Sequence, residues 1–279
     1  MNRNDLFDNY EFLIDTIVNA KRLKRGRLLT VGMYVKGEQY HLGKEHRLLI
    51  VGRALNGWKA KDIVWSTGNV NISASEKAIQ ILNHWHNQET SPDWGENTNR
   101  FYDRALTKPV LEAECIALEW IHSYYRGGES KSLIKTSELP FWRYAGLISQ
   151  AVLDIQDNGW SKQIAWTNLY KIAPAEEGNP SNALCQRQLL ACQQILKKEL
   201  DLLKPTHILV IAKTRHRGNK IDSPETDSWT KDFYEIFEEY QKSEKYPVYI
   251  SYVARPEFAS EEQFNEMIEQ TKKDFKLKN

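Results

Sequence analysis

Basic and polar residues follow each of four short apolar segments, and their side chains are suited to binding an anion. Guanidinium and ammonium groups hold phosphate through charge-assisted hydrogen bonds, and arginine can form two such bonds at once. A lone surface cation is more often only solvated, so the evidence lies in the convergence of several cations at one edge. The candidate phosphate or nucleic-acid contacts are Arg53, Lys171, Arg215, Arg217 and Arg255.

The four apolar segments have the length and the β-branched or aromatic content of buried strands. They are His46–Gly52, Gln163–Leu169, His207–Ala212 and Val248–Val253. Helical patterns lie between them, which predicts right-handed crossovers and a covered, mostly parallel sheet. Ligands of such sheets bind beyond the carboxyl ends of the strands, where the basic residues are expected to meet.

If these segments form adjacent parallel strands, the residue in the middle of each should be buried. The sequence therefore predicts burial at Val51, Ala165, Ile211 and Ile250.

Four segments have the 3.6-residue hydrophobic period of amphipathic helices. Ser181–Leu203 has the clearest pattern, with Ser181 as its expected N-cap and Pro205 just beyond its end. Acidic helices are predicted at Trp229–Glu244 and Ser260–Lys273, and a further helix at Asp5–Leu23.

The 279 residues are expected to form one domain, because no Gly/Ser-rich or Pro-rich linker divides them. An N-terminal helical extension would occupy about 1–44, and a helical insertion would occupy about 59–140. Within the insertion, helical patterns at Ser75–Asn87 and Pro109–Tyr125 flank a polar loop.

Composition predicts a cytoplasmic protein with no membrane partner, since 41% of the residues are hydrophobic, 27% are charged and no apolar run could span a bilayer. The net charge of +1 says little about partners, because a balanced total can hide strong local fields. The three cysteines form no C-x-x-C pair, and the histidines lack metal-ligand spacing. We therefore predict no metal site.

The stretch from Trp166 to Ala212 resembles the uracil-DNA glycosylase superfamily. Its motifs are WTNLYKIAP, then GNPSNA, then a cysteine, leucine and glutamate pattern that leads through Lys204-Pro205 into the third apolar segment. With the first apolar segment and the final loop, the resemblance covers about half of the chain. It implies a three-layer α/β/α sandwich with a short, mostly parallel four-stranded sheet.

The resemblance also implies roles for residues beyond the strand ends. Asn168 matches the asparagine that hydrogen-bonds the edge of an extruded base, which an amide can do because it donates and accepts together. Gly52 and Ala54 match a Gly-Glu-Ala-Pro-Gly loop, in which Arg53 replaces the acid. Two residues that match no position of the family could supply the missing group: Asn56 would hold a water, or Asp62 would reach the site from the insertion.

The final loop departs from the family pattern at its first residue. Arg255 stands where a histidine is expected, and Pro256 matches the proline that follows. Arg255 would contact the base carbonyl or a phosphate, with a fixed charge that a neutral histidine lacks. Members of the closest branch often carry an iron–sulfur cluster with four thiolate ligands, whereas this chain has three cysteines. No cofactor is predicted.

The leading hypothesis is a uracil-DNA glycosylase-like protein that binds a nucleobase, nucleotide or nucleic acid, with DNA or a nucleotide as its partner. The activity implied is DNA N-glycosylase hydrolysis in DNA repair, with non-standard catalytic loops. One alternative is a non-catalytic nucleic-acid-binding module on the same fold. Another is an enzyme acting on a small phosphorylated metabolite.

Overall fold

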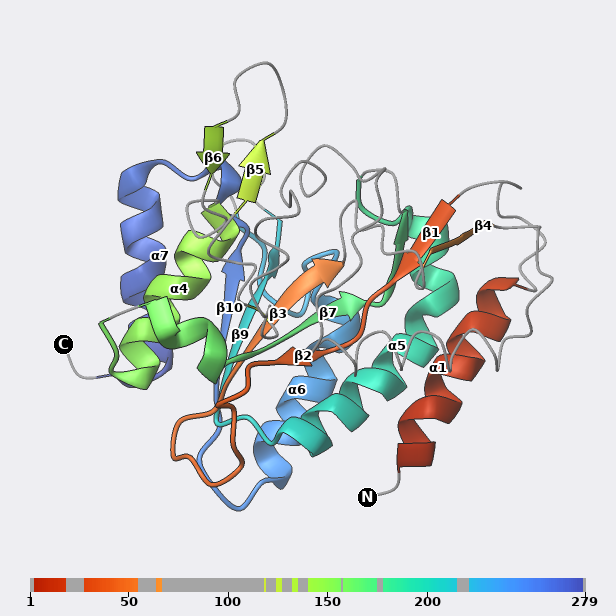
Figure 1. Cartoon of the computed structure of the whole chain (residues 1–279), viewed down its shortest axis with the longest axis horizontal. Coiled ribbons are helices and arrows are strands. Elements are labelled where there is room, and N and C mark those ends of the chain that lie inside the picture. Colours follow the sequence, from red (N-terminus) through yellow and green to blue (C-terminus); the bar gives the residue numbers. More distant parts are fainter. Residues whose placement is uncertain are drawn as a thin grey trace.

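The protein has a mixed α/β fold built around a five-stranded sheet (Figure 1). Four strands are mutually parallel, and the short edge strand β2 runs antiparallel to its neighbour β7. The order is β10-β9-β3-β7-β2. The computed structural model describes residues 3–18, 28–54, 64–66, 118, 124–126, 132–134, 140–156, 158–174, 178–214 and 221–277. The strand bounds are β2 Val35–Lys36, β3 Leu48–Ala54, β7 Ala165–Tyr170, β9 His207–Lys213 and β10 Tyr249–Ala254.

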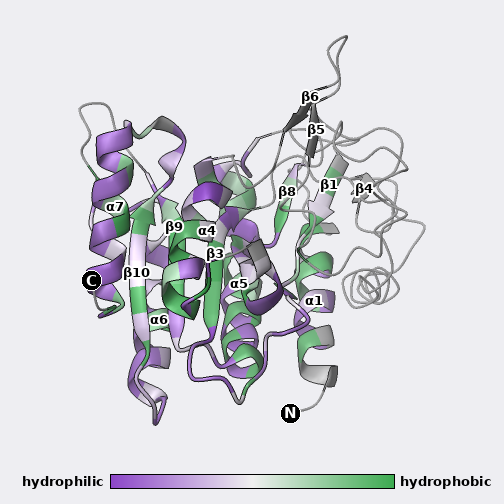
Figure 2. Ribbon diagram, turned by 60° about the vertical axis from the view of Figure 1, so that its left-hand side comes forward, coloured by the Kyte–Doolittle hydropathy of each residue, from purple (hydrophilic) through white to green (hydrophobic). Residues whose placement is uncertain are grey.

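The four predicted strands are confirmed as one parallel sheet, but the sheet has a fifth strand that was not predicted. Val51, Ala165 and Ile211 are fully buried, as expected. Ile250 is only partly buried, because β10 is an edge strand with a neighbour on one side. Figure 2 shows the same gradient, with β3 strongly hydrophobic and β10 paler.

Helices cover both faces of the sheet, as the alternating side chains of β10 demonstrate. Ser251 donates to Asp274 Oδ2 at 2.6 Å, at the end of α7 (Glu261–Asp274). The next residue, Tyr252, packs its ring against Phe237 of α6 (Lys231–Ser243). Since successive strand residues point to opposite faces, α7 and α6 lie on opposite sides of the sheet.

Strand β7 gives the same result for the other helix pair. The Trp166 ring packs 5.4 Å from that of Trp142 in α4 (Pro140–Leu153). Thr167 donates to Glu199 of α5 (Asn182–Leu203) at 2.8 Å. Figure 1 shows α4 beside α7, and α5 beside α1 (Arg3–Val18).

The predicted helices α1, α5, α6 and α7 all form. Helix α5 begins after Ser181, whose side chain accepts from Leu184 N, and ends at Leu203 before the left-handed residue Lys204. Helix α4 was not predicted, although Pro140 suits the first turn of a helix. Buried residues recur along α4 at a spacing of three or four.

The N-terminal extension was expected to be helical, but it also contains strands. Within it, β1 (Leu28–Val31) and β2 follow α1. Strand β1 forms a second, antiparallel sheet in the order β4-β1-β8, with β4 at Val64–Ser66 and β8 at Ile172–Pro174. The N-terminal segment is thereby joined by backbone hydrogen bonds to the chain that leaves β7.

The described part of the insertion is β-structure rather than helix. Tyr124 and Tyr125, which end the predicted helix 109–125, lie in β5 (Tyr124–Arg126), consistent with the β-propensity of aromatic residues. Strand β5 pairs with β6 (Ser132–Ile134) in an antiparallel ladder. The predicted helix 75–87 lies outside the described residues. None of the described helices has the length and apolar character needed to cross a membrane.

Gly37, which follows β2, is predicted to be irreplaceable. A Cβ there would lie 2.2 Å from the carbonyl oxygen of Lys162, which is backbone and cannot rotate away. Gly37→Ala should lower the free energy of unfolding by about 1–3 kcal/mol through overpacking. Gly43→Ala is the matched control, because a Cβ at Gly43 meets no atom within 4 Å. Equal denaturation midpoints for the two variants in urea would contradict this account of the β2–β7 edge.

Candidate functional site

The carboxyl ends of β3, β7, β9 and β10 lie side by side, because the four strands are parallel and in register. Gly52 stands opposite Asn168, and Ala254 opposite Lys213. The topology therefore brings together five of the predicted site residues, which are Gly52, Arg53, Ala54, Asn168 and Arg255. We call this edge the carboxyl rim.

Asn168 and Gly52 are in unusually close contact across β7 and β3. A Cβ at Gly52 would lie 2.5 Å from Asn168 Oδ1, so only glycine leaves room for this amide. The Phe141 ring, at the start of α4, lies 3.7 Å from the same position. Asn168 is 3% exposed, and its Nδ2 finds no acceptor among the described residues. A buried donor without a partner is costly, which makes this amide the clearest candidate for contact with a ligand.

The predicted phosphate contact requires the Arg53 guanidinium to extend freely from the rim. The guanidinium instead binds the protein itself. Its Nε donates to Ala212 O at 2.6 Å and its Nη2 to Lys213 O at 2.9 Å, so it binds the carboxyl end of β9. The guanidinium also lies 4.9 Å from the centre of the Trp229 ring. Burial, followed by the field of Arg255, lowers the pKa of Arg53 to about 10, and the side chain remains charged at neutral pH.

Arg255 lies at the rim, but its charge is already paired. Its Nε donates to Glu257 Oε1 at 2.8 Å, and its Nη2 contacts the same oxygen. Its backbone N–H donates to Lys213 O, the carbonyl that also accepts from Arg53. The carboxylate of Glu257 reduces the positive field that the sequence predicted at this edge.

Lys171 was predicted to contact phosphate, and this prediction is wrong, because its side chain is fully buried. Its Nζ donates to Glu199 Oε2, Thr167 Oγ1 and the carbonyl of Asn168, each at 2.7 Å. Thr167 also donates to Glu199. The sequence pattern gave no sign of this ion pair, because its partners stand 28 residues apart. Asn56, Asp62, Arg215 and Arg217 lie outside the described residues.

The two described cysteines are buried on α5, and Cys192 lies next to Lys171. Burial raises the pKa of Cys185 to about 11 and that of Cys192 to about 12, so both thiols stay protonated at neutral pH. Cys192 Sγ lies 3.4 Å from the backbone nitrogen of Lys171. Within the described ranges, no group of three His, Cys, Asp or Glu residues could hold a metal ion.

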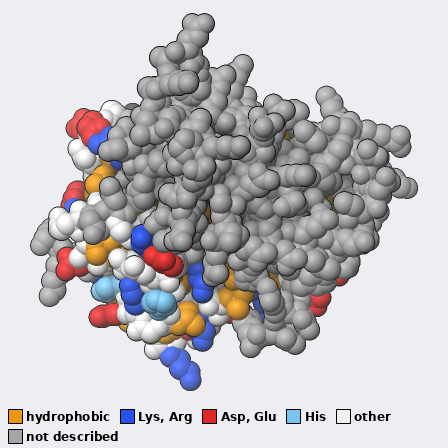
Figure 3. Space-filling view, viewed as in Figure 1, with side chains coloured by type: hydrophobic (Ala, Val, Ile, Leu, Met, Phe, Trp, Pro, Cys, Tyr) orange, Lys and Arg blue, Asp and Glu red, His pale blue; other side chains and the backbone are white. Residues whose placement is uncertain are grey.

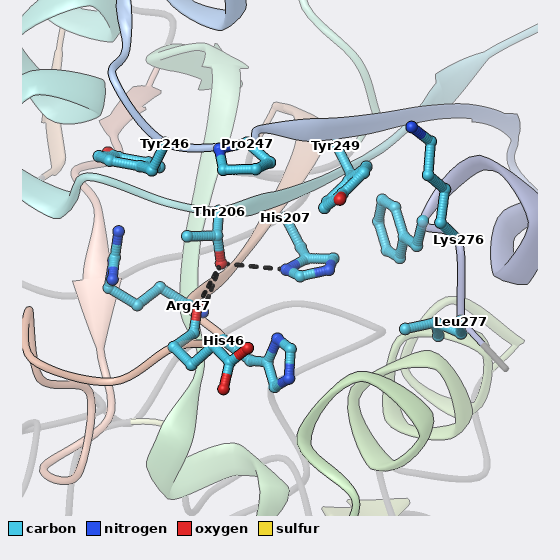
Figure 4. Close-up of a pocket in the computed structure, with 11 residues that line it drawn as sticks. His46, Arg47, Thr206, His207, Tyr246, Pro247, Tyr249, Lys276 and Leu277 are labelled. Carbon is cyan, nitrogen blue, oxygen red and sulfur yellow. Dashed lines mark hydrogen bonds between the residues drawn. The ribbon is translucent and has the colours of Figure 1, made fainter.

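A cavity of about 400 Å³ lies at the opposite end of the sheet, where β3, β9 and β10 begin (Figure 4). On the face in Figure 3, histidine side chains lie beside lysine or arginine side chains toward the lower left, the end at which these strands begin. No sequence pattern pointed to this cavity, because ligands of parallel sheets are expected at the carboxyl ends of the strands. Its lining includes His46, Arg47, Thr206, His207, Tyr249 and Lys276.

His207 is the buried titratable group of this cavity. Its Nδ1 lies 3.0 Å from Thr206 Oγ1, which also accepts from Arg47 N at 2.9 Å. Its ring is packed edge-on against those of His46 and Phe275. Burial, with the nearby charges of His46 and Arg47, lowers the pKa of His207 to about 4.

Comparison of the sequence with protein-family models and with curated proteins found no match.

Removing one partner of the buried Lys171–Glu199 ion pair should destabilise the fold more than removing both. Lys171→Met leaves the Glu199 carboxylate buried and unpaired, at an expected cost of about 3–5 kcal/mol in the free energy of unfolding. Combining it with Glu199→Leu should restore most of that loss. Lys197→Met is the control, because the ion pair between Lys197 of α5 and Glu239 of α6 is solvent-exposed and worth at most about 1 kcal/mol. If the double variant were no more stable than Lys171→Met, the coupling would be refuted.

His207 should make stability depend on pH in a defined window. Its ordinary pKa is about 6.5, and its folded pKa is about 4, so between these values the unfolded chain binds a proton that the folded chain does not. Stability is therefore present above pH 6.5 and is lost as the pH falls toward 4. When the pH falls from 7 to 4.5, the free energy of unfolding of the wild type should decrease by about 2 kcal/mol more than that of His207→Asn. Urea denaturation at each pH measures this difference.

The control for this measurement is His41→Asn, because His41 is exposed and does not line the cavity. It should retain the full pH dependence of the wild type. A His207→Asn profile parallel to that of the wild type would show that another group carries the dependence.

Proposed function

We propose that the chain is a uracil-DNA glycosylase-like protein that holds a nucleobase at the carboxyl rim, with Asn168 reading the edge of the base. The observation that carries the proposal is the buried Asn168 amide, whose Nδ2 has no acceptor among the described residues. The motif around Asn168 is also the part of the sequence that resembles that superfamily. The helices on both faces of a mostly parallel sheet are consistent with it.

The chemistry of the amide suits a nucleobase. A pyrimidine edge places a carbonyl next to a ring N–H, and a carboxamide can donate to the first and accept from the second. In a site with 3% exposure, each such bond is made without competition from water, so a ligand lacking the edge leaves Asn168 unpaired. This asymmetry would give the site its selectivity.

Gly52 and Phe141 complete the proposed base site. Gly52 lets the β3 backbone approach the amide, and the Phe141 ring lies on the same side of the sheet. Phe141 also packs edge-on against Trp142, with ring centres 4.9 Å apart, which restricts its orientation. A fixed aromatic ring beside the amide offers a surface on which a base can stack.

Binding without hydrolysis is favoured by one specific observation, the Arg255–Glu257 pair. Arg255 occupies the position where the resemblance expects a neutral donor to stabilise the departing base anion. Its guanidinium instead donates to Glu257, so part of its capacity to stabilise a new negative charge is already used. The non-catalytic module is therefore the second candidate, with the same base site.

The amide contact is tested by binding a single-stranded uracil-containing oligonucleotide, followed by fluorescence anisotropy at fixed salt. Asn168→Ala should raise the Kd by about 5- to 150-fold, the equivalent of about 1–3 kcal/mol. Gly52→Ala should weaken binding in the same direction, because its Cβ displaces Asn168 Oδ1 while the amide remains. Asn182→Ala, on the exposed first turn of α5, is the matched control.

The outcomes separate the hypotheses. Unchanged affinity in Asn168→Ala and Gly52→Ala, with both folded by circular dichroism, would refute the base site. Released uracil that depends on Asn168 would establish the glycosylase reading, whereas intact binding without release would favour the non-catalytic module. Tight binding of uridine monophosphate, with no affinity for the oligonucleotide, would favour an enzyme that acts on a small phosphorylated metabolite.

A further inference from the structure

The cavity at the amino ends of the strands contains a buried cation, Arg47, that forms no ion pair with any described carboxylate. Arg47 is 8% exposed, and its donors go to backbone carbonyls, with Nε on Lys204 O and Nη1 on Leu42 O and Lys44 O. No carboxylate of the described residues lies within 4.0 Å of its guanidinium. Carbonyl dipoles hold the group in place, and its Cζ lies 4.9 Å from the centre of the Tyr246 ring, but no described carboxylate neutralises its charge.

A second cation stands at the other side of the same cavity. Lys276 Nζ lies 5.4 Å from the centre of the Tyr249 ring, and no ion pair with a described carboxylate engages it. Glu45 is the one acidic side chain among the described residues that line the cavity. With His207 neutral at pH 7, the two cations outnumber this carboxylate, and the cavity attracts anions.

Aromatic rings form the wall between the two cations. The His207 ring centre lies 5.2 Å from that of Tyr249 and 5.1 Å from that of Phe275. Figure 4 shows the His207 and Tyr249 rings beside the cavity, with Arg47 and Lys276 on either side of them. Flat apolar surfaces of this kind bury a ring favourably, and a volume of about 400 Å³ lies in the range of small-molecule sites.

His207 can offer this ligand either a donor or an acceptor. The Thr206 hydroxyl has one proton and two acceptors in reach, Glu45 O at 3.1 Å and His207 Nδ1 at 3.0 Å. When Thr206 donates to Nδ1, the neutral ring carries its proton on Nε2. Figure 4 shows that second nitrogen directed away from Thr206. An anion near Nε2 would favour this tautomer.

We infer that the cavity is a second binding site, separate from the carboxyl rim, for a small aromatic anion. The ring of the ligand packs against Tyr249, Phe275 and His207. Its anionic group lies in the field of Arg47 and Lys276 and accepts a hydrogen bond from His207 Nε2. A carboxylate and a phosphate share this chemistry.

The test uses benzoate and its neutral isostere benzamide, titrated into the full chain by isothermal calorimetry at pH 7. Benzoate should bind in the range below about 10 mM, and benzamide at least about tenfold more weakly. Lys276→Glu should weaken benzoate by about tenfold while changing benzamide by less than about twofold. Lys273→Glu is the matched control, because Lys273 is exposed near the same end of α7 but does not line the cavity.

Two further measurements locate the ligand and define its anion. Long-range ¹⁵N NMR of the histidine rings should show benzoate moving His207 toward the Nε2–H tautomer, while Asn168→Ala leaves benzoate affinity unchanged. Phenyl phosphate binding tighter than benzoate would identify the natural ligand as a phosphate, and the reverse order as a carboxylate. Equal affinity for benzoate and benzamide, loss of binding in Asn168→Ala, or no benzoate effect on His207 would overturn the inference.

Discussion

Strand β3 is hydrogen-bonded to β7 on one side and to β9 on the other, and its residues Leu48–Val51 are fully buried. The position of every candidate group depends on this pairing. Because the register is fixed, Gly52 meets Asn168 at the carboxyl end and Arg47 meets Thr206 at the amino end. A slip of one residue would turn each side chain to the opposite face and remove both sites.

Three cations of the described residues bind the protein itself. Arg53 holds the carbonyls at the end of β9, Arg47 holds those of the segments before β3 and β9, and Lys171 neutralises Glu199 inside the core. The contacts of Arg53 with Ala212, of Arg47 with Lys204 and of Lys171 with Glu199 each join residues more than 25 positions apart. A guanidinium satisfies several carbonyls at once, which suits it to the places where strands end and backbone acceptors lose their ladder partners.

The two ends of the sheet consequently present different chemistry. At the carboxyl rim, an acidic partner offsets Arg255, and the distinctive group is a neutral buried amide. At the amino end, the distinctive groups are two cations without carboxylate partners among the described residues, beside aromatic rings. A neutral hydrogen-bonding edge fits the first environment and a ring with a negative charge fits the second, so we treat them as sites for different ligands.

The sequence by itself determined the elements whose signals are local. The hydrophobic period and Ser181 defined α5, and the apolar runs defined four parallel strands, because both patterns follow from the geometry of one segment. The motif around Asn168 also led to the prediction of a base contact at the end of β7. Only the tertiary structure decided that Ile250 lies at an edge, that Lys171 is buried against Glu199, that Asn168 Nδ2 lacks an acceptor among the described residues, and that a cavity forms around His207. These properties depend on which distant segments meet, and no local pattern encodes that.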